Sequence, residues 1–282
     1  NITNNSIYDF NASNLGIGLY AVANSYKIIF ANNNVFNSSR YGVQIDQTTA
    51  SVIENNTIVN STNDGIRIST ETGGNIIIKN NSVRRFGNNG ITVLTSDNNV
   101  TNNVVNESLH SSTDGLVVSG TSRGIILNNT VSSISRRGLW LNSANRNGII
   151  NNSISNSDTA VLISDSSANN NITNNTIYNN TYGLILLGLT DNNNLSNNLI
   201  RDNFIGIFIN TTTPASRTFV FNNTLNNNTL FGINVTASYN TTIFNNLITN
   251  STFGLSVGAN SNENNIGAIK SKISLPNKFK IT

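Results

Sequence analysis

A glycine followed by two aliphatic residues at alternate positions recurs along the chain about every 24 residues. The aliphatic pair, such as Ile66 and Ile68 or Ile17 and Leu19, has the spacing of side chains on one face of a β-strand. A fixed period of this length is typical of a repeat architecture. The sequence therefore predicts about eleven repeats, beginning at Gly16, Gly42, Gly65, Gly90, Gly115, Gly138, Ala160, Gly183, Gly206, Gly232 and Gly254.

A pair of asparagines recurs with the same period. An apolar residue lies two positions after the second asparagine and another three positions before it, as Phe36 and Ala31 do around Asn34. An odd separation cannot place both side chains on one face of a straight strand, so the chain must bend near the pair. Asparagine tolerates the left-handed backbone of such a bend. The second members are Asn5, Asn34, Asn56, Asn81, Asn103, Asn129, Asn152, Asn175, Asn198, Asn223 and Asn246.

These units predict an all-β fold, a right-handed parallel β-helix of three-strand coils. Each unit holds three short strands, and its loops are too short for crossover helices. Equivalent residues of coils about 4.8 Å apart would then stack into aliphatic and asparagine ladders inside the solenoid. A second amide ladder is expected after each third strand, at Asn60, Asn156, Asn179, Asn227 and Asn250.

The repeat covers residues 1–267, and a basic tail of different composition occupies residues 268–282. The tail contains Lys270, Lys272, Lys278 and Lys280, and its apolar residues alternate as in a strand. Three readings stay open. The tail caps its own coil stack, adds a strand to a neighbouring subunit, or links to a further domain.

The segment NNTIYNNTYGLILLGLTDNNNLSNN at residues 174–198 resembles the right-handed parallel β-helix repeat family, pectin-lyase-like solenoids with an asparagine-rich surface-protein branch. The resemblance extends over residues 1–267. It implies the fold and leaves the function open, because that family hosts lyases, hydrolases, epimerases, copper-accessory proteins, adhesins and scaffolds.

Composition excludes several classes of partner and cofactor. Charged residues make up 10% of the chain and the net charge is +3 without a dense basic stripe, so we expect no nucleic acid partner. The chain has no Cys, no Met and one His, which argues against disulfides, copper, other metals and cofactors. No apolar run reaches the ~18 residues of a membrane span.

A glycoside hydrolase would need two or three carboxylates converging on one patch. Asp64 and Asp114 fall in the same column two coils apart, with Asn89 between them. Each aspartate precedes a glycine, so a turn-forming Asp-Gly role is the favoured reading.

A polysaccharide lyase would need a basic proton abstractor near acidic residues. The best catalytic candidates are Asp114, Arg136, Arg137 and His110, although a lone loop histidine is more often a solvated residue. We therefore expect a protein that is not an enzyme. If it is one, it would be a polysaccharide lyase or a glycoside hydrolase.

Five consecutive coils place an apolar residue between the paired aliphatic positions, where alternation points it outward. Soluble proteins rarely expose such a stripe, so we expect another subunit or a loop of the same chain to cover it. Stacking of Trp140 and Phe208 on sugar rings is the alternative. The partner-binding candidates are Val117, Trp140, Leu162, Ile185 and Phe208.

Asn-x-Ser/Thr sequons are frequent, and several use the first member of an asparagine pair, for example Asn55 and Asn128. Paired positions are expected to be partly buried. The preferred glycosylation candidates are therefore Asn210, Asn234 and Asn240.

Together these features predict a secreted or cell-surface structural or adhesive β-solenoid. We expect it to be a subunit of a larger extracellular assembly or filament that associates with itself or with another surface protein. The alternative is a β-helix protein that binds or cleaves polysaccharide.

Overall fold

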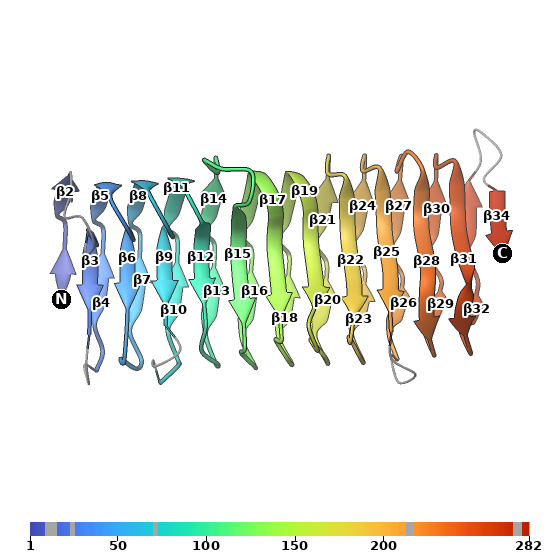
Figure 1. The fold of residues 1–282 in the computed structure, drawn as a ribbon, viewed down its shortest axis with the longest axis horizontal. Coiled ribbons are helices and arrows are strands. Elements are labelled where there is room, and N and C mark those ends of the chain that lie inside the picture. Colours follow the sequence, from blue (N-terminus) through green and yellow to red (C-terminus); the bar gives the residue numbers. More distant parts are fainter. Residues whose placement is uncertain (9–15, 23–25, 70–72, 213–216, 273–277, 282) are drawn as a thin grey trace. The chain divides into compact units, whose positions relative to one another are not determined.

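The computed structural model describes all residues except 9–15, 23–25, 70–72, 213–216, 273–277 and 282, and residues 271, 272 and 278–281 are described by their backbone alone. The chain divides into two compact units, Asn1–Trp140 and Leu141–Thr282. Each unit is built from coils of three short strands, with equivalent strands side by side (Figure 1). The predicted all-β parallel solenoid is confirmed in each.

In the first unit, three parallel series of strands follow one another around the coils. The first is β1 (Ile2–Thr3), β4 (Ile29–Ala31), β7 (Val52–Glu54), β10 (Ile77–Lys79), β13 (Asn99–Thr101) and β16 (Ile125–Leu127). The second is β2 (Ser6–Tyr8), β5 (Asn34–Ser38), β8 (Thr57–Ser61), β11 (Ser82–Phe86), β14 (Val104–Asn106) and the start of β17 (Thr130–Asn142). The third is β3 (Leu19–Ala21), β6 (Val43–Ile45), β9 (Ile66–Ile68), β12 (Asn89–Val93) and β15 (Asp114–Ser119).

The second unit repeats this plan. Its first series is β18 (Gly148–Ile150), β20 (Asn171–Thr173), β23 (Asn194–Ser196), β26 (Phe219–Phe221), β29 (Thr242–Phe244) and β32 (Asn265–Gly267). The strand β19 (Ser153–Ser164) serves both other series. These continue as β21 (Thr176–Tyr178), β24 (Leu199–Arg201), β27 (Thr224–Asn226), β30 (Leu247–Thr249) and β33 (Lys270–Lys272), and as β22 (Tyr182–Gly188), β25 (Ile205–Thr211), β28 (Phe231–Tyr239), β31 (Phe253–Asn262) and β34 (Lys278–Ile281).

The paired asparagines make the predicted bend and the predicted ladder. The first member turns the chain, as at Asn174 with a φ of 58°. The second member lies inside, as at Asn175, whose Nδ2 donates to Asn198 Oδ1 at 3.0 Å and to the carbonyl of Ile149 at 2.8 Å. These bonds satisfy a buried amide and a buried turn carbonyl at once, so the asparagine content has a structural cause.

Two details of the predicted phase are wrong near the N-terminus. In the triplet Asn32–Asn34 the ladder residue is Asn33, which donates to Asn56 Oδ1 at 3.0 Å, so Val35 and Phe30 fill the core. In the preceding repeat the glycine that stacks on Gly42 is Gly18 and not Gly16, because Gly18 donates to the carbonyl of Tyr41 at 3.0 Å. Runs of identical residues and a nearby second glycine left the phase ambiguous.

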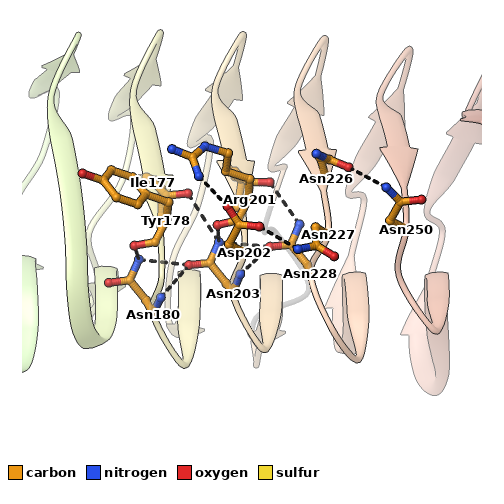
Figure 2. A network of polar contacts seen from close by, with 11 residues as sticks. Ile177, Tyr178, Asn180, Arg201, Asp202, Asn203, Asn226, Asn227, Asn228 and Asn250 are labelled. Carbon is orange, nitrogen blue, oxygen red and sulfur yellow. Dashed lines mark hydrogen bonds and ion pairs between the residues drawn. The ribbon is translucent and has the colours of Figure 1, made fainter.

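The second amide ladder exists, but one position later than predicted. Asn60, Asn156, Asn179, Asn227 and Asn250 are the left-handed turn residues, with φ between 54° and 64°, and none is buried. The buried ladder consists of Asn180, Asn203 and Asn228, whose amides bond in sequence (Figure 2). A residue that makes a left-handed corner points outward, so the residue after it points inward. A third ladder, Asn147, Asn170 and Asn193, was not predicted.

The basic tail continues the second unit. The strand β33 pairs parallel with β30 through Leu247 and Lys270, and β34 pairs parallel with β31 through Phe253 and Lys278. These two strands extend two strand series of the second unit, and the three readings of the tail stay predictions. The division at residue 267 stays a prediction, since the tail adds strands to the same sheets.

Candidate functional site

Three of the four predicted catalytic residues, Asp114, Arg136 and Arg137, form a network of ion pairs on the first unit. Asp114 opens β15 and Arg136 lies in β17 on the next coil, where its backbone N–H donates to the carbonyl of Thr113. Arg136 Nε donates to Asp114 Oδ1 at 2.9 Å and its Nη2 donates to Oδ2. Arg137 Nη1 lies 3.8 Å from the same Oδ2. The hydrogen bond that Arg136 donates to Asp114 raises the pKa of Arg136 above its usual value.

Asp64 occupies the equivalent position two coils earlier and is fully buried. Its Oδ1 accepts hydrogen bonds from Asn88 Nδ2 at 2.8 Å and from the Asn89 backbone N–H at 3.2 Å, and its Oδ2 lies 3.1 Å from Arg67 Nη1. The register of Asn89 opposite Asp114 confirms that Asn89 lies between the two aspartates. Both carboxylates are therefore held by donors, an arrangement that anchors arginines and suits neither acid nor base catalysis well.

Arginines stack on two aromatic rings beside these aspartates. The guanidinium carbon of Arg137 lies 3.9 Å from the ring centre of Trp140, and that of Arg136 lies 6.0 Å from it. Arg40 and Arg67 lie 4.7 Å and 5.5 Å from the ring centre of Tyr41. We call these six residues the arginine face. Arg67 is paired with the buried Asp64, and Arg136 and Arg137 are both paired with the buried Asp114.

The first unit also contains a polar groove of about 490 Å³. One of its lining residues, Ser39, directly precedes Arg40 and Tyr41 of the arginine face in the chain. Gly87 lies close to two of the groove's lining residues, because an added Cβ there would come within 2.0 Å of the Thr62 carbonyl oxygen and 3.3 Å of His110 Cδ2. The loop between β14 and β15 supplies its far wall. The lining residues are Asn37, Ser38, Ser39, Asn60, Thr62, Leu109 and His110.

The structure thus places His110 in the groove, while Asp114, Arg136 and Arg137 meet on the adjacent face. Among the contacts recorded for the described residues, none joins the imidazole to that cluster. Within the same residues no group of three His, Asp or Glu side chains is arranged to hold a metal ion. The two halves of the predicted catalytic cluster therefore lie at neighbouring sites.

Sequence reasoning missed the groove, although the chain carries a signal for it. Gly115 follows Asn103 by 12 positions, whereas Gly90 follows Asn81 by 9. The longer coil gives the loop that holds Leu109 and His110, and Figure 1 shows it before β15. Insertions in solenoid repeats map to surface loops and often to the binding face.

The five predicted partner-binding residues divide between the units. In the first unit, Val117 is 5% exposed and Trp140 is half-buried. In the second, Leu162, Ile185 and Phe208 stand in register, and Leu162 is 8% exposed. The expected exposure is therefore wrong for Val117 and Leu162, and Ile185 stands in register with Leu162 on the next coil. A partner at these residues stays a prediction.

A charged corner network lies on the second unit (Figure 2). The guanidinium carbon of Arg201 lies 4.6 Å from the ring centre of Tyr178, and Arg201 forms an ion pair with Asp202. Asp202 also accepts a hydrogen bond from Asn227 Nδ2 at 2.7 Å. The bond from Asn227 lowers the pKa of Asp202, burial partly opposes this, and Arg201 adds to the lowering. The network links three successive coils at their outer corner.

The predicted glycosylation candidates are all half-buried. Asn210 lies on the outer face of β25, and Asn234 lies in β28 between Phe208 and Ser256. Asn240 follows β28 in a left-handed turn with a φ of 51°. Sequon asparagines at the first position of a pair are instead exposed, so their expected partial burial is wrong. These include Asn55, Asn128, Asn151, Asn174 and Asn222.

The chain matches the family described as right handed beta helix region over residues 1–106 and 99–268. It therefore belongs to the right-handed parallel β-helix family. A comparison with curated protein sequences gave no significant match.

Solved structures of the same fold include a phage protein and two epimerases. The pre-mature gene product 12 of bacteriophage phi29 matches with a TM-score of 0.71 and 14% identity over 87% of this chain, which spans only 41% of that protein. The Azotobacter vinelandii mannuronan C-5 epimerase AlgE4 A-module matches with a TM-score of 0.67 and 13% identity, and the match covers 99% of this chain and 78% of the module. The periplasmic alginate epimerase AlgG matches with a TM-score of 0.56 and 12% identity, and the match covers 86% of this chain and 75% of that protein. At these identities the likeness shows the fold alone.

The part of the chain that the structure describes contains no apolar helix of membrane-spanning length.

Proposed function

We propose that the protein is an extracellular β-solenoid with an adhesive role, and that the first unit binds an acidic polysaccharide. The observation that carries the proposal is the pairing of the arginine face with a groove lined by hydroxyl and amide groups. Arginine recognises carboxylates with two parallel hydrogen bonds. Hydroxyl and amide groups both donate to and accept from sugar hydroxyls.

Charge supports an acidic ligand over a neutral one. Asp64 and Asp114 are buried and hold Arg67 and Arg136 in place, so their carboxylates would not face the ligand. Arg40 and Arg137 lie over Tyr41 and Trp140 and add two further positive charges to these clusters. Two of the similar structures are named for polysaccharides, mannuronan and alginate, which agrees with the proposal without establishing it.

Affinity electrophoresis of the whole chain tests the proposal. The gels contain polymannuronate, polygalacturonate or neutral dextran at equal mass. Retardation by a uronate polymer, absent with dextran and weakened by salt, is the expected result. Equal mobility in all gels would overturn it. A depolymerisation assay on the same polymers separates binding from cleavage, and unchanged polymer length supports a binding role.

A second candidate function is a scaffold subunit that associates through the second unit. In its first strand series the rings of Phe221 and Phe244 stack with their centres 5.1 Å apart. Phe219 and Phe244 are 42% and 39% exposed. Exposed aromatic clusters are common at protein contacts. Mass in solution, measured with and without residues 268–282, tests this candidate, and monomers in both cases would defeat it.

A further inference from the structure

The outer corner between the first and second strand series carries a column of sequons. Each of these asparagines has a left-handed backbone, with φ between 54° and 60°, and each is exposed. The fold therefore aims the side chains at solvent along one edge of each unit. The column consists of Asn4, Asn55, Asn80 and Asn128 in the first unit and Asn151, Asn174 and Asn222 in the second.

The ladder explains why sequons collect at this corner. Except at Asn4, where the next residue Asn5 is exposed, the middle residue of each sequon is the buried ladder asparagine, for example Asn129 or Asn223, each 1% exposed. The third residue opens the next strand, and its side chain points outward because the residue after it is buried, as Thr130 precedes Val131 and Thr224 precedes Leu225. The corner asparagine and the sequon hydroxyl thus both lie outside the core.

The sequons on strand faces offer a poorer setting. Asn234 stands between Phe208 and Ser256, with hydrogen-bonded strands on both sides. Asn210 stands between Leu187 and Ala237, again with hydrogen-bonded strands on both sides. A bulky glycan there would cover neighbouring coils, whereas a corner glycan projects away from them.

We propose that this corner column is the N-glycosylation site of the folded protein. The reaction joins the asparagine Nδ2 to the anomeric carbon of a lipid-diphosphate-linked oligosaccharide. The Nδ2 loses a proton and the lipid diphosphate leaves, so no oxidant or reductant is needed. At Asn222, the side-chain oxygen accepts a hydrogen bond from Asn245 at 2.7 Å, which leaves the bond-forming Nδ2 outside this contact. The column lies at a different corner of the coil from the polar groove, so glycans would leave the groove open.

The experiment removes and creates corner sequons without touching the corner asparagines. Thr130→Val and Thr224→Val each delete the hydroxyl of one sequon while keeping a β-branched residue at the start of a strand. Val104→Thr and Leu199→Thr each create a sequon, at Asn102 and Asn197, where the column has a gap. Val104 and Leu199 are 41% and 37% exposed, so neither change opens the core.

Each variant is secreted from a eukaryotic host and compared by intact mass, with site mapping after enzymatic glycan release in ¹⁸O water. Thr236→Val, which deletes the strand-face sequon of Asn234, is the matched control. We expect the two deletions to lose one glycan at Asn128 or Asn222, the two creations to gain one, and the control to match the parent. A parent without glycans, glycans mapped mainly to Asn210 or Asn234, or unchanged masses in all four corner variants would overturn the proposal.

Discussion

Arg136 donates hydrogen bonds to both carboxylate oxygens of Asp114, a residue that is only 1% exposed. The two residues lie 22 positions apart in the chain and on successive coils, so the contact ties one repeat to the next. A buried carboxylate is costly without its partner. The pair therefore links the stability of the first unit to the arrangement of the arginine face.

Replacing Arg136 by methionine keeps most of the aliphatic stem and removes the paired charge. We expect the free energy of unfolding to fall by about 2–4 kcal/mol. This is near or below the cost of breaking a fully buried ion pair, because Arg136 is half-exposed and Arg137 remains close to Asp114. Urea unfolding measures the change. The double variant Arg136→Met with Asp114→Asn should recover part of the loss, and a double variant less stable than Arg136→Met would contradict this account.

The buried asparagine ladder predicts opposite outcomes at two adjacent positions. Asn175→Ala removes the amide that bonds to Asn152, Asn198 and the Ile149 carbonyl, and should cost about 3 kcal/mol or more because several buried groups lose partners. Asn174→Gly should be nearly neutral, because glycine accepts the φ of 58° at this exposed corner. Thermal unfolding compares them. Equal losses would show that the ladder bonds contribute little.

The two asparagine ladders also show how far the sequence predicts the structure. Period and spacing predicted the strands, the bends and the first ladder, because every coil obeys the same packing rule. They did not separate a corner residue from the ladder residue after it, so the second ladder was assigned to Asn179 where the structure has Asn180. Neighbouring asparagines carry the same side chain, and only the backbone conformation distinguishes their roles.

The candidate site was less predictable for a physical reason. The column of Asp64, Asn89 and Asp114 follows from the repeat register and was predicted. The stacking of Arg137 on Trp140 and the position of His110 depend on side-chain rotamers and on one irregular loop, which periodicity does not determine.

The repeat glycines predict a sharp steric effect. An added Cβ at Gly206 would lie 2.5 Å from the Gly232 carbonyl oxygen and 2.9 Å from Leu225 Cδ2, so Gly206→Ala must displace backbone. We expect a loss of about 1–3 kcal/mol, the range for overpacked cores. Gly148→Ala is the control, because its Cβ would meet the flexible end of Ile150 at 3.3 Å. Denaturant midpoints measure both, and equal shifts would argue against the close approach.

The lowered pKa of Asp202 predicts an acid-dependent contribution to stability. Its folded pKa lies below its unfolded pKa, so the contribution is present above about pH 4 and is lost as the pH falls through the folded value. Asn227→Gly removes the largest cause and should raise the Asp202 titration midpoint observed by NMR. Asn250→Gly, at a similar left-handed corner, should leave that midpoint unchanged. An unaltered midpoint in Asn227→Gly would assign the lowering to Arg201 instead.

Binding of acidic polysaccharide should depend on the stacked pair of Arg137 and Trp140. Arg137→Gln removes the charge beside the ring, and we expect a polymannuronate Kd weaker by about 5- to 30-fold, equivalent to ~1–2 kcal/mol for the loss of a hydrogen bond to a charged group. Isothermal titration calorimetry at two salt concentrations measures it, with a smaller salt dependence expected for the variant. Arg123→Gln, which removes an exposed arginine paired with Asp97, is the matched charge control. Equal weakening by both variants would point to unspecific attraction, and a folded Arg137→Gln with unchanged affinity would place the polysaccharide elsewhere.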